Sequence, residues 1–401
     1  MIHSHLGQRY VSRGKSQQRT SHCLYMGGRV PVGKLGCCGE VNARKCGLHG
    51  LCATTKQDFD NIRTVQNGIS LKRCDTCPDR IELPDGEIPV PTGKLRVGML
   101  SPNWYVGGVE RWFQTLARYS ELEIVGVAVD SGNRVSPAML GNGFRVTHDR
   151  HELVSNSDVL LIWHHVPEIQ QYNKPTVFVI HGCLPFSYKW SELHSDLPQV
   201  AVSHNALSVN PNATVIPNGV DESRLQPTCS REEYRYKLGL KPDDTALLYV
   251  GRFSSEKDPL RCWQTAKGMG AKAIYCCSGL NDDWKQQVPG AIITDDSQLG
   301  DLYRACDAMV FGSENESFGL VIAEAWYCGL PVVAHQTGVV LEQGCSHLVT
   351  TPVDGDWISA VQKALTGNTT KEAQQVCMER FTGSVMASKW DSFLLEVSSL
   401  A

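Results

Sequence analysis

Residues 307–334 read DAMVFGSENESFGLVIAEAWYCGLPVVA, and this stretch decides how its part of the chain is expected to fold. Its first five residues, Asp307 to Phe311, are typical of a buried strand, and residues 312–317 of a polar loop. Phe318 to Cys328 has the pattern of a helix, which Gly329 would end. A strand therefore leads through a loop to a helix N-terminus, where unpaired backbone N–H groups can bind an anion such as a diphosphate.

Two carboxylates belong to this stretch. Glu316 lies in the loop and Glu324 in the predicted helix. Eight residues of helix rise about 12 Å, so the two carboxylates would contact separate parts of one elongated ligand, such as a sugar and a ribose. Glycosidase pairs are closer, at roughly 5 to 9.5 Å, so that chemistry is not expected. The helical neighbours of Glu324 are largely apolar, and a carboxylate among them should have a partner.

Length and composition limit the number of domains and the class of protein. A chain of 401 residues can form two domains and an appendage. Its 38 basic and 42 acidic residues nearly balance, which gives no sign of a general nucleic-acid binder. No run of about 18 apolar residues occurs, so no membrane-spanning helix is expected. The first residues lack the apolar core of a secretory signal, and they are basic. We interpret them as a disordered tail, with a transit peptide or a lipid-contacting arm as alternatives.

The pattern of short apolar segments divides the chain into four parts. Residues 1–93 form a Cys-rich segment with a basic tail and a linker, 94–217 and 218–384 form two domains, and 385–401 form a terminal helix. The expected strands are Leu95–Leu100, Glu123–Val129, Asp158–Trp163, Thr176–Ile180, Gln199–Ser203, Ala213–Pro217, Ala246–Gly251, Lys272–Cys277, Ala291–Ile293, Ala308–Phe311 and Pro331–Ala334. Strands that alternate with helical crossovers predict α/β domains, each a doubly wound, Rossmann-like parallel sheet covered on both faces.

The N-terminal segment is dense in cysteine. Cys74 and Cys77 form a knuckle that can place two thiolates on one metal. Cys46 with Cys52 could complete a tetrahedral site, with Cys37, Cys38 and His49 as alternates. A structural zinc would let a segment so poor in apolar residues fold. Free or disulfide-paired thiols and an iron–sulfur cluster are the alternatives. Cysteines of the later strands and helices, such as Cys276, Cys277 and Cys306, are interpreted as small core residues.

Three further motifs follow predicted strands. They are Gly107–Arg111 (GGVER), Asn218–Asp221 (NGVD) and Gly251–Lys257 (GRFSSEK). Together with the segment from Glu316 to Glu324, they resemble the family 4 retaining glycosyltransferases (glycosyl transferases group 1), in the order in which that family carries them. The resemblance covers residues 95–338 and implies a GT-B fold, in which two Rossmann-like domains face each other across a cleft. It leaves residues 1–93 unexplained.

The resemblance also implies roles for individual residues. The implied catalytic residues are His181 beside the donor sugar, Arg252 and Lys257 on the diphosphate, and Glu316 on the transferring sugar. Contacts to the donor would come from Gly107, Gly108, Asn218, Phe318, Gly319 and Glu324, with Glu324 on the ribose hydroxyls. Without the resemblance, Arg252 and Lys257 would be interpreted as a surface pair at a helix start, and Glu316 as a carboxylate favoured by the helix dipole. Glu110 and Arg111 contact the acceptor or cap their helix.

Several residues depart from the family or favour a structural role. The segment Thr337–Glu342 lacks one of the two glycines that the family usually has there, and the first domain is short. The triplet Asp354-Gly355-Asp356 is interpreted as a turn and helix cap rather than as a metal site. His164 and His165 are interpreted as structural.

The resemblance thus implies a metal-independent, retaining, hexosyltransferase-like enzyme. It would move a sugar from a UDP- or GDP-sugar to a hydroxyl of a lipid, glycan or small molecule, in cell-envelope or polysaccharide biosynthesis. We expect it in the cytoplasm or peripherally at the inner face of the membrane, with no nucleic-acid partner. One alternative is a catalytically silent GT-B scaffold, and another is a phosphorylase- or epimerase-like enzyme of the same fold.

Overall fold

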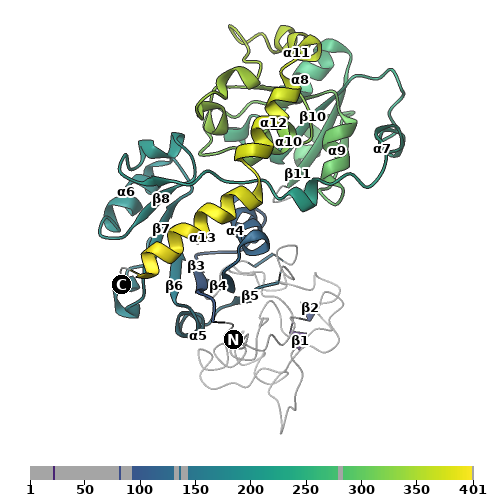
Figure 1. Cartoon of the computed structure of the whole chain (residues 1–401). Helices are drawn as coiled ribbons and strands as arrows, with labels where there is room; N and C mark the ends of the chain where they lie inside the picture. Colours follow the sequence, from purple (N-terminus) through teal and green to yellow (C-terminus); the bar gives the residue numbers. More distant parts are fainter. Residues whose placement is uncertain are drawn as a thin grey trace, which may run out of the picture. The chain divides into compact units, whose positions relative to one another are not determined.

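The computed structural model describes residues 93–130, 135–136, 143–278 and 283–399, and the backbone of a two-stranded sheet formed by β1 (Ser21–His22) and β2 (Ile81–Glu82). The chain forms two compact units. The first extends to Phe178 and takes in the end of the chain from Phe393, and the second runs from Val179 to Ser392. Figure 1 labels many of the helices and strands, which are numbered in chain order.

The first large sheet has seven strands in the order β5-β4-β3-β6-β7-β8-β9. The strands are β3 (Arg96–Ser101), β4 (Glu123–Val129), β5 (Arg145–Thr147), β6 (Val159–Ile162), β7 (Thr176–Ile180), β8 (Gln199–Ala201) and β9 (Thr214–Val215). Central β3 is parallel to both neighbours, and Leu100 pairs with Ala128 and with Ile162. Five of the seven strands have only buried residues after their first one or two, as expected for a sheet covered on both faces. The short polar strand β5 was not predicted.

Three α-helices accompany this sheet in the chain: α4 (Gly108–Tyr119), α5 (Arg150–Asn156) and α6 (Pro185–Leu193), with the 3₁₀ turns η2 (Ile169–Tyr172) and η3 (Asn205–Ser208). Helix α4 buries Trp112 and Phe113 completely. The Phe113 ring meets Trp104 and Phe144 edge-on, with centroids 5.9 and 5.2 Å away. Such edge-to-face contacts add to the free energy of apolar burial.

The second sheet has five strands in the order β12-β11-β10-β13-β14. They are β10 (Ala246–Arg252), β11 (Lys272–Ser278), β12 (Ile292–Thr294), β13 (Ala308–Phe311) and β14 (Val332–Ala334), and each strand is parallel to its neighbours. Around them lie α7 (Arg231–Lys237), α8 (Leu260–Met269), α9 (Leu299–Ala305), α10 (Leu320–Tyr327), α11 (Trp357–Thr366) and α12 (Thr370–Arg380). Shorter 3₁₀ turns are η4 (Glu222–Leu225), η5 (Ser255–Lys257), η6 (Asp283–Gln287), η7 (Gly338–Leu341) and η8 (Ser346–Leu348).

The two parallel-sheet α/β domains confirm the predicted fold class. All five predicted strands of the second sheet are present within about a residue at each end. The terminal helix predicted near the end of the chain is also present, as α13 (Gly383–Ser399), and it has a buried face that includes Met386 and Trp390. Within the described residues, no helix combines the length and apolar character needed to cross a membrane.

Two stretches of backbone pair as a short parallel bridge where α13 begins. The Val220 N–H donates to the Phe381 carbonyl, and the Gly383 N–H donates to the Val220 carbonyl, both at 2.8 Å. The two backbone segments are so close at Gly219 that a Cβ atom there would lie 2.2 Å from the Thr382 carbonyl oxygen. Only glycine fits that approach, which explains the second residue of the NGVD motif.

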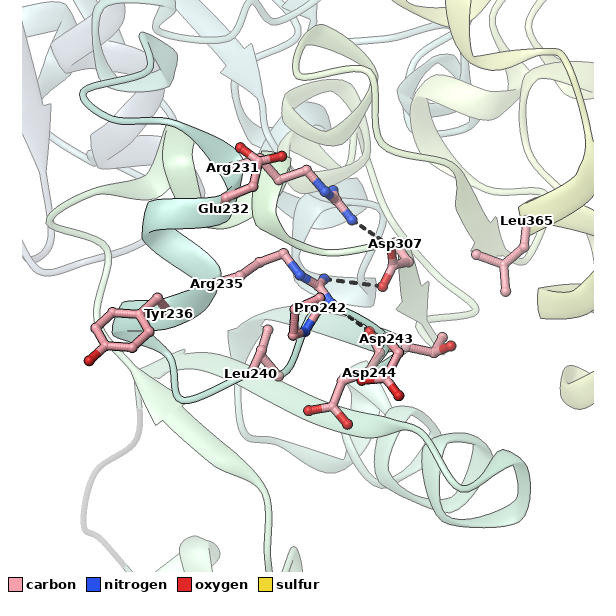
Figure 2. Close-up of a pocket in the computed structure, with 11 residues that line it drawn as sticks. Arg231, Glu232, Arg235, Tyr236, Leu240, Pro242, Asp243, Asp244, Asp307 and Leu365 are labelled. Carbon is pink, nitrogen blue, oxygen red and sulfur yellow. Dashed lines mark hydrogen bonds and ion pairs between the residues drawn. The ribbon is translucent and has the colours of Figure 1, made fainter.

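A surface pocket of about 610 Å³ lies at the edge of the second sheet where the strands begin (Figure 2). Arg231 and Arg235 of α7 point toward Asp307, which precedes β13, with N–O distances of 2.5 and 3.4 Å. The same guanidinium groups also donate to carbonyls, including those of Cys306 and Ala305. Because these donors are used to attach α7 to the sheet, we assign the pocket a structural role.

Candidate functional site

The candidate site lies at the other edge of the second sheet, where the parallel strands end. Strand β10 ends at Arg252 and its neighbour β13 at Phe311, and Leu248 is in register with Met309. Segments that leave these two strands therefore emerge side by side. This is the edge at which ligands bind in open α/β sheets.

Lys257 and Glu316 are in direct contact at this edge. Lys257 ends η5, Glu316 lies in the loop before α10, and the Lys257 ammonium is 2.6 Å from Glu316 Oε1. The side chains are only 17% and 11% exposed. An ion pair that is mostly shielded from water is stronger than a surface pair. The two residues that the sequence assigned to separate parts of a donor are thus partners of each other in this structure.

The side chain of Arg252 is more exposed to solvent than those of Lys257 and Glu316. Its side chain is 55% exposed, and it lies 3.4 Å from the equally exposed Glu256. Exposed pairs of this kind contribute little, so the guanidinium can turn toward a ligand at small cost. Its backbone is more tightly held, because the buried Tyr249 hydroxyl donates to the Arg252 carbonyl at 2.8 Å.

Helix α10 begins two residues later than expected. Gly319 is its N-cap and has φ of +78°, a left-handed conformation that glycine adopts without strain. The helix therefore starts at Leu320 rather than Phe318, and only part of the step from Glu316 to Glu324 is helical. The rise of about 12 Å for eight helical residues does not apply here. Phe318 is buried and packs edge-on against Phe381.

Glu324 has the partner that its apolar surroundings predicted. The carboxylate is buried, and the Tyr303 hydroxyl of α9 donates to its Oε2 at 2.8 Å. Burial raises the pKa of Tyr303 well above its usual value, so the hydroxyl stays protonated and remains a donor. The sequence indicated that a partner was needed but did not identify Tyr303, because the two residues are on different helices.

The loop after β14 packs on the Glu316 loop. Thr337 Oγ1 accepts a hydrogen bond of 2.8 Å from the Glu316 N–H, and the Val339 N–H donates to the Phe318 carbonyl at 2.6 Å. Gly338 has φ of +58°, and a Cβ atom there would lie 2.4 Å from the Phe318 carbonyl oxygen. This is the glycine that the segment keeps, and the buried Val339 stands where the resembled family usually has a second one.

His181 follows β7 and also contacts this loop. Its carbonyl accepts a 2.6 Å hydrogen bond from the Ser317 hydroxyl. The ring atom Nε2 has almost no exposed surface, although the residue as a whole is half-buried. Burial lowers the pKa of His181 to about 3, so the imidazole is neutral at physiological pH.

The remaining predicted donor contacts are spread over both units. Gly107 is the N-cap of α4 in the first unit, and a Cβ atom there would lie 2.6 Å from Glu110 Oε2; Gly108 begins that helix. Asn218 is buried in the second unit, and its N–H donates to the Val202 carbonyl. Of the predicted structural histidines, His164 is buried.

The predictions about metals divide into two groups. The Asp354 triplet is a turn with positive φ at its first residue, and Asp356 caps α11 by accepting from the Ser359 N–H at 3.0 Å. The cap interpretation is therefore confirmed. Among the residues that the structure describes, no cluster of three or more His, Cys, Asp or Glu is suited to a metal. The proposed ligands Cys46, Cys52, Cys74 and Cys77 lie outside the described residues.

Comparison with known proteins agrees with this geometry. Residues 230–372, which carry the second sheet and the Lys257–Glu316 pair, match the family model of glycosyl transferases group 1. The resemblance is confirmed. The D-inositol 3-phosphate glycosyltransferase of Actinosynnema mirum is 30% identical over 211 residues, which are 43% of this chain and 50% of that protein. The enzyme of the same name from Rhodococcus jostii is 32% identical over 178 residues, 37% of this chain and 38% of that protein. The match therefore spans half or less of these relatives.

Solved structures of similar fold extend over more of the chain. Anabaena HepE in complex with UDP and glucose aligns with a TM-score of 0.60 over 75% of this chain and 100% of its own, at 19% identity. WaaG, a glycosyltransferase involved in lipopolysaccharide biosynthesis, aligns with a TM-score of 0.56 over 74% of this chain and 98% of its own, at 14% identity. At such low identities the likeness shows the fold alone, and that fold is GT-B.

Replacing Tyr303 tests the support of Glu324. In Tyr303→Phe, the buried Glu324 carboxylate loses its hydrogen-bond donor, while the aromatic ring keeps its size and shape. We expect the free energy of unfolding to fall by about 1.5 to 3 kcal/mol, the usual range for a hydrogen bond to a charged group. Urea denaturation measures it. Tyr327→Phe, on the helix that carries Glu324, is the control and should change stability less. Equal stability of Tyr303→Phe and the wild type would contradict the assigned contact.

The neutral state of His181 predicts a pH dependence of stability. An unfolded histidine takes up a proton below about pH 6.5, whereas folded His181 does so only near pH 3. The unfolded state binds more protons in between, so stability falls as pH falls through this window. As the pH falls from about 7.5 to about 5, the low pKa of His181 should lower the free energy of unfolding by up to about 2 kcal/mol. His181→Asn should lack this component. A stability difference between wild type and variant that stays constant over the window would show that folding does not lower the pKa of His181.

Proposed function

We propose that this chain is a retaining glycosyltransferase that moves a sugar from a nucleoside-diphosphate sugar to a hydroxyl group of an acceptor. The observation that carries the proposal is the shielded contact between Lys257 and Glu316 at the carboxyl edge of the second sheet. The buried Glu324 lies on α10, the helix that follows Glu316 in the chain. One cation and two carboxylates suit a donor of this kind. Lys257 would contact the diphosphate, Glu316 the transferring sugar and Glu324 the ribose.

The cations have a direct part in the proposed reaction. When the bond between the sugar and the diphosphate breaks, negative charge develops on the leaving phosphate oxygens. Lys257 and Arg252 would stabilise that charge, and fixed positive groups of this kind can act without a divalent metal. When Lys257 turns to the diphosphate, Glu316 is released to accept a hydrogen bond from a hydroxyl of the transferring sugar. Glu324 would accept from the ribose hydroxyls.

Two of the comparisons suggest which substrates to test first. HepE is structurally similar and has been solved with UDP and with UDP-glucose, which favours UDP over GDP as the nucleotide of the donor. The matched relatives named D-inositol 3-phosphate glycosyltransferases make a phosphorylated polyol one acceptor to test. We propose a role in cell-envelope or polysaccharide biosynthesis, in the cytoplasm or peripherally at the membrane. A zinc site in the Cys-rich N-terminal segment remains a separate proposal.

Two alternatives make different predictions. A silent scaffold would keep the fold without binding nucleotides. The paired Lys257 and Glu316 favour the enzyme, because a scaffold has no need of a mostly buried charge pair at the edge of the sheet where ligands bind. A phosphorylase- or epimerase-like enzyme would bind similar substrates. Product analysis with and without inorganic phosphate separates it from a transferase.

The first test is a calorimetric screen of the full chain against UDP, GDP, ADP and their sugar conjugates in EDTA. We expect saturable binding of a UDP compound, and a loss of about tenfold or more in affinity in Arg252→Ala and Glu324→Ala, since each removes a charged contact. Binding that requires Mg²⁺ would contradict metal independence. A folded protein that binds none of the compounds would favour the scaffold.

The second test compares two glutamates of one loop. Glu316→Gln keeps the size of the side chain but removes the charge beside Lys257, and we expect kcat to fall by about a hundredfold or more, as for the loss of a preorganised polar group in an active site. Glu314, two residues earlier, is exposed, and Glu314→Gln is the matched control that should keep full activity. Equal kcat in the two variants would exclude Glu316 from the reaction. The anomeric configuration of the product, read by NMR, tests retention.

A further inference from the structure

Three consecutive residues after β8 hold the loop that carries Glu316. The Ser203 hydroxyl donates to the Ser317 carbonyl, and the Asn205 side-chain amide donates to the Glu316 carbonyl at 2.6 Å. His204 lies between them and contacts Glu342. All of these residues belong to the second unit. We call Ser203, His204 and Asn205 the clasp.

Glu342 holds His204, the middle residue of the clasp, through two contacts. Its side chain has no exposed surface, and it accepts a 2.7 Å hydrogen bond from the His204 N–H. Its second oxygen lies 2.6 Å from His204 Nδ1. A buried carboxylate is costly unless hydrogen bonds satisfy it, so these contacts fix His204 firmly. They also fix its neighbours Ser203 and Asn205 in place.

The backbone of Glu316 is held through both its N–H and its carbonyl group. Its N–H donates to Thr337 Oγ1, and its carbonyl accepts from Asn205. The next carbonyl, that of Ser317, accepts from Ser203. A loop with positive φ at Gly319 and no helical hydrogen bonds of its own would otherwise have several backbone conformations open to it. The position of the Glu316 carboxylate beside Lys257 therefore depends on side chains about a hundred residues earlier in the chain.

We propose that Ser203 and Asn205 are positioning residues for sugar transfer, which act by fixing the backbone of Glu316, and that Glu342 and His204 hold them in place. This inference rests on the proposed function, because it assigns Glu316 to the transferring sugar. None of the clasp side chains needs to touch the substrate. A reacting group displaced by about 1 Å can lose a hundredfold in rate, so such residues affect turnover strongly.

The test compares residues of one short segment. Asn205→Ala removes the donor to the Glu316 carbonyl, whereas Asn210→Ala removes a side chain that bonds only within its own region, to Gln199 and the Asn212 N–H. We expect kcat to fall about tenfold to a hundredfold in Asn205→Ala, with the Kd for UDP within about twofold of wild type. Asn210→Ala should keep kcat. A loss of kcat of the same size in both variants would show a general structural role and overturn the proposal.

His204 supplies a second pair of variants that should fold, because its side chain is 55% exposed. His204→Leu removes the ring nitrogen next to Glu342. His204→Asn places an amide close to the position of Nδ1 and should restore most of the activity that His204→Leu loses. If the two variants have equal kcat, the contact between His204 and Glu342 does not support the loop.

Hydrogen exchange separates this inference from the proposed function. Amides of residues 312–319 should exchange about tenfold faster in Asn205→Ala and His204→Leu than in the wild type and Asn210→Ala, whether or not the protein transfers a sugar. Unchanged exchange overturns the clasp even in an active enzyme. Faster exchange in a protein that binds no nucleotide and transfers no sugar means that the proposed function has failed, and the catalytic part of this inference with it.

Discussion

Parallel strands that are covered on both faces constrain where polar chemistry can occur in this protein. Most side chains of β10 and β13 are fully buried and apolar, so charged groups can reach a ligand only beyond the strand ends. The short loops that leave those ends carry Arg252, Lys257 and Glu316. Helix α7 and its arginines close the opposite edge. The candidate site is therefore a consequence of sheet topology as much as of particular residues.

Much of this could be predicted from the sequence, because its signals are local. Apolar runs such as those of β4, β7 and β13 gave the same boundaries as the structure. Short polar β5 could not be found, since three residues with arginine and threonine do not form a hydrophobic pattern. The start of α10 was placed too early because the pattern of apolar residues continues through Phe318, while the backbone turns at Gly319.

The contacts of the site were harder to predict than its residues. Glu316, Glu324 and Lys257 came from motifs, yet the partners Tyr303, Asn205 and Thr337 did not. Each partner lies on another element, between 21 and 111 residues away in the chain. Spacing along a chain identifies neighbours on one helix or strand, and it carries no information on such distant pairs. The buried Glu342 is similar: the sequence placed it at the end of a segment that lacks a glycine, and its role followed only from its contact with His204.

The backbone pairing between Val220 and the segment from Phe381 to Gly383 has a mechanical consequence. Two hydrogen bonds of 2.8 Å and the close approach at Gly219 join segments that are about 160 residues apart in the chain. Glu222 adds a bond to the Gly383 N–H from the same side. If a protease cut either segment nearby, the new ends would remain attached to the uncut one. A nicked molecule would thus stay assembled under native conditions and would show its two fragments only on a denaturing gel.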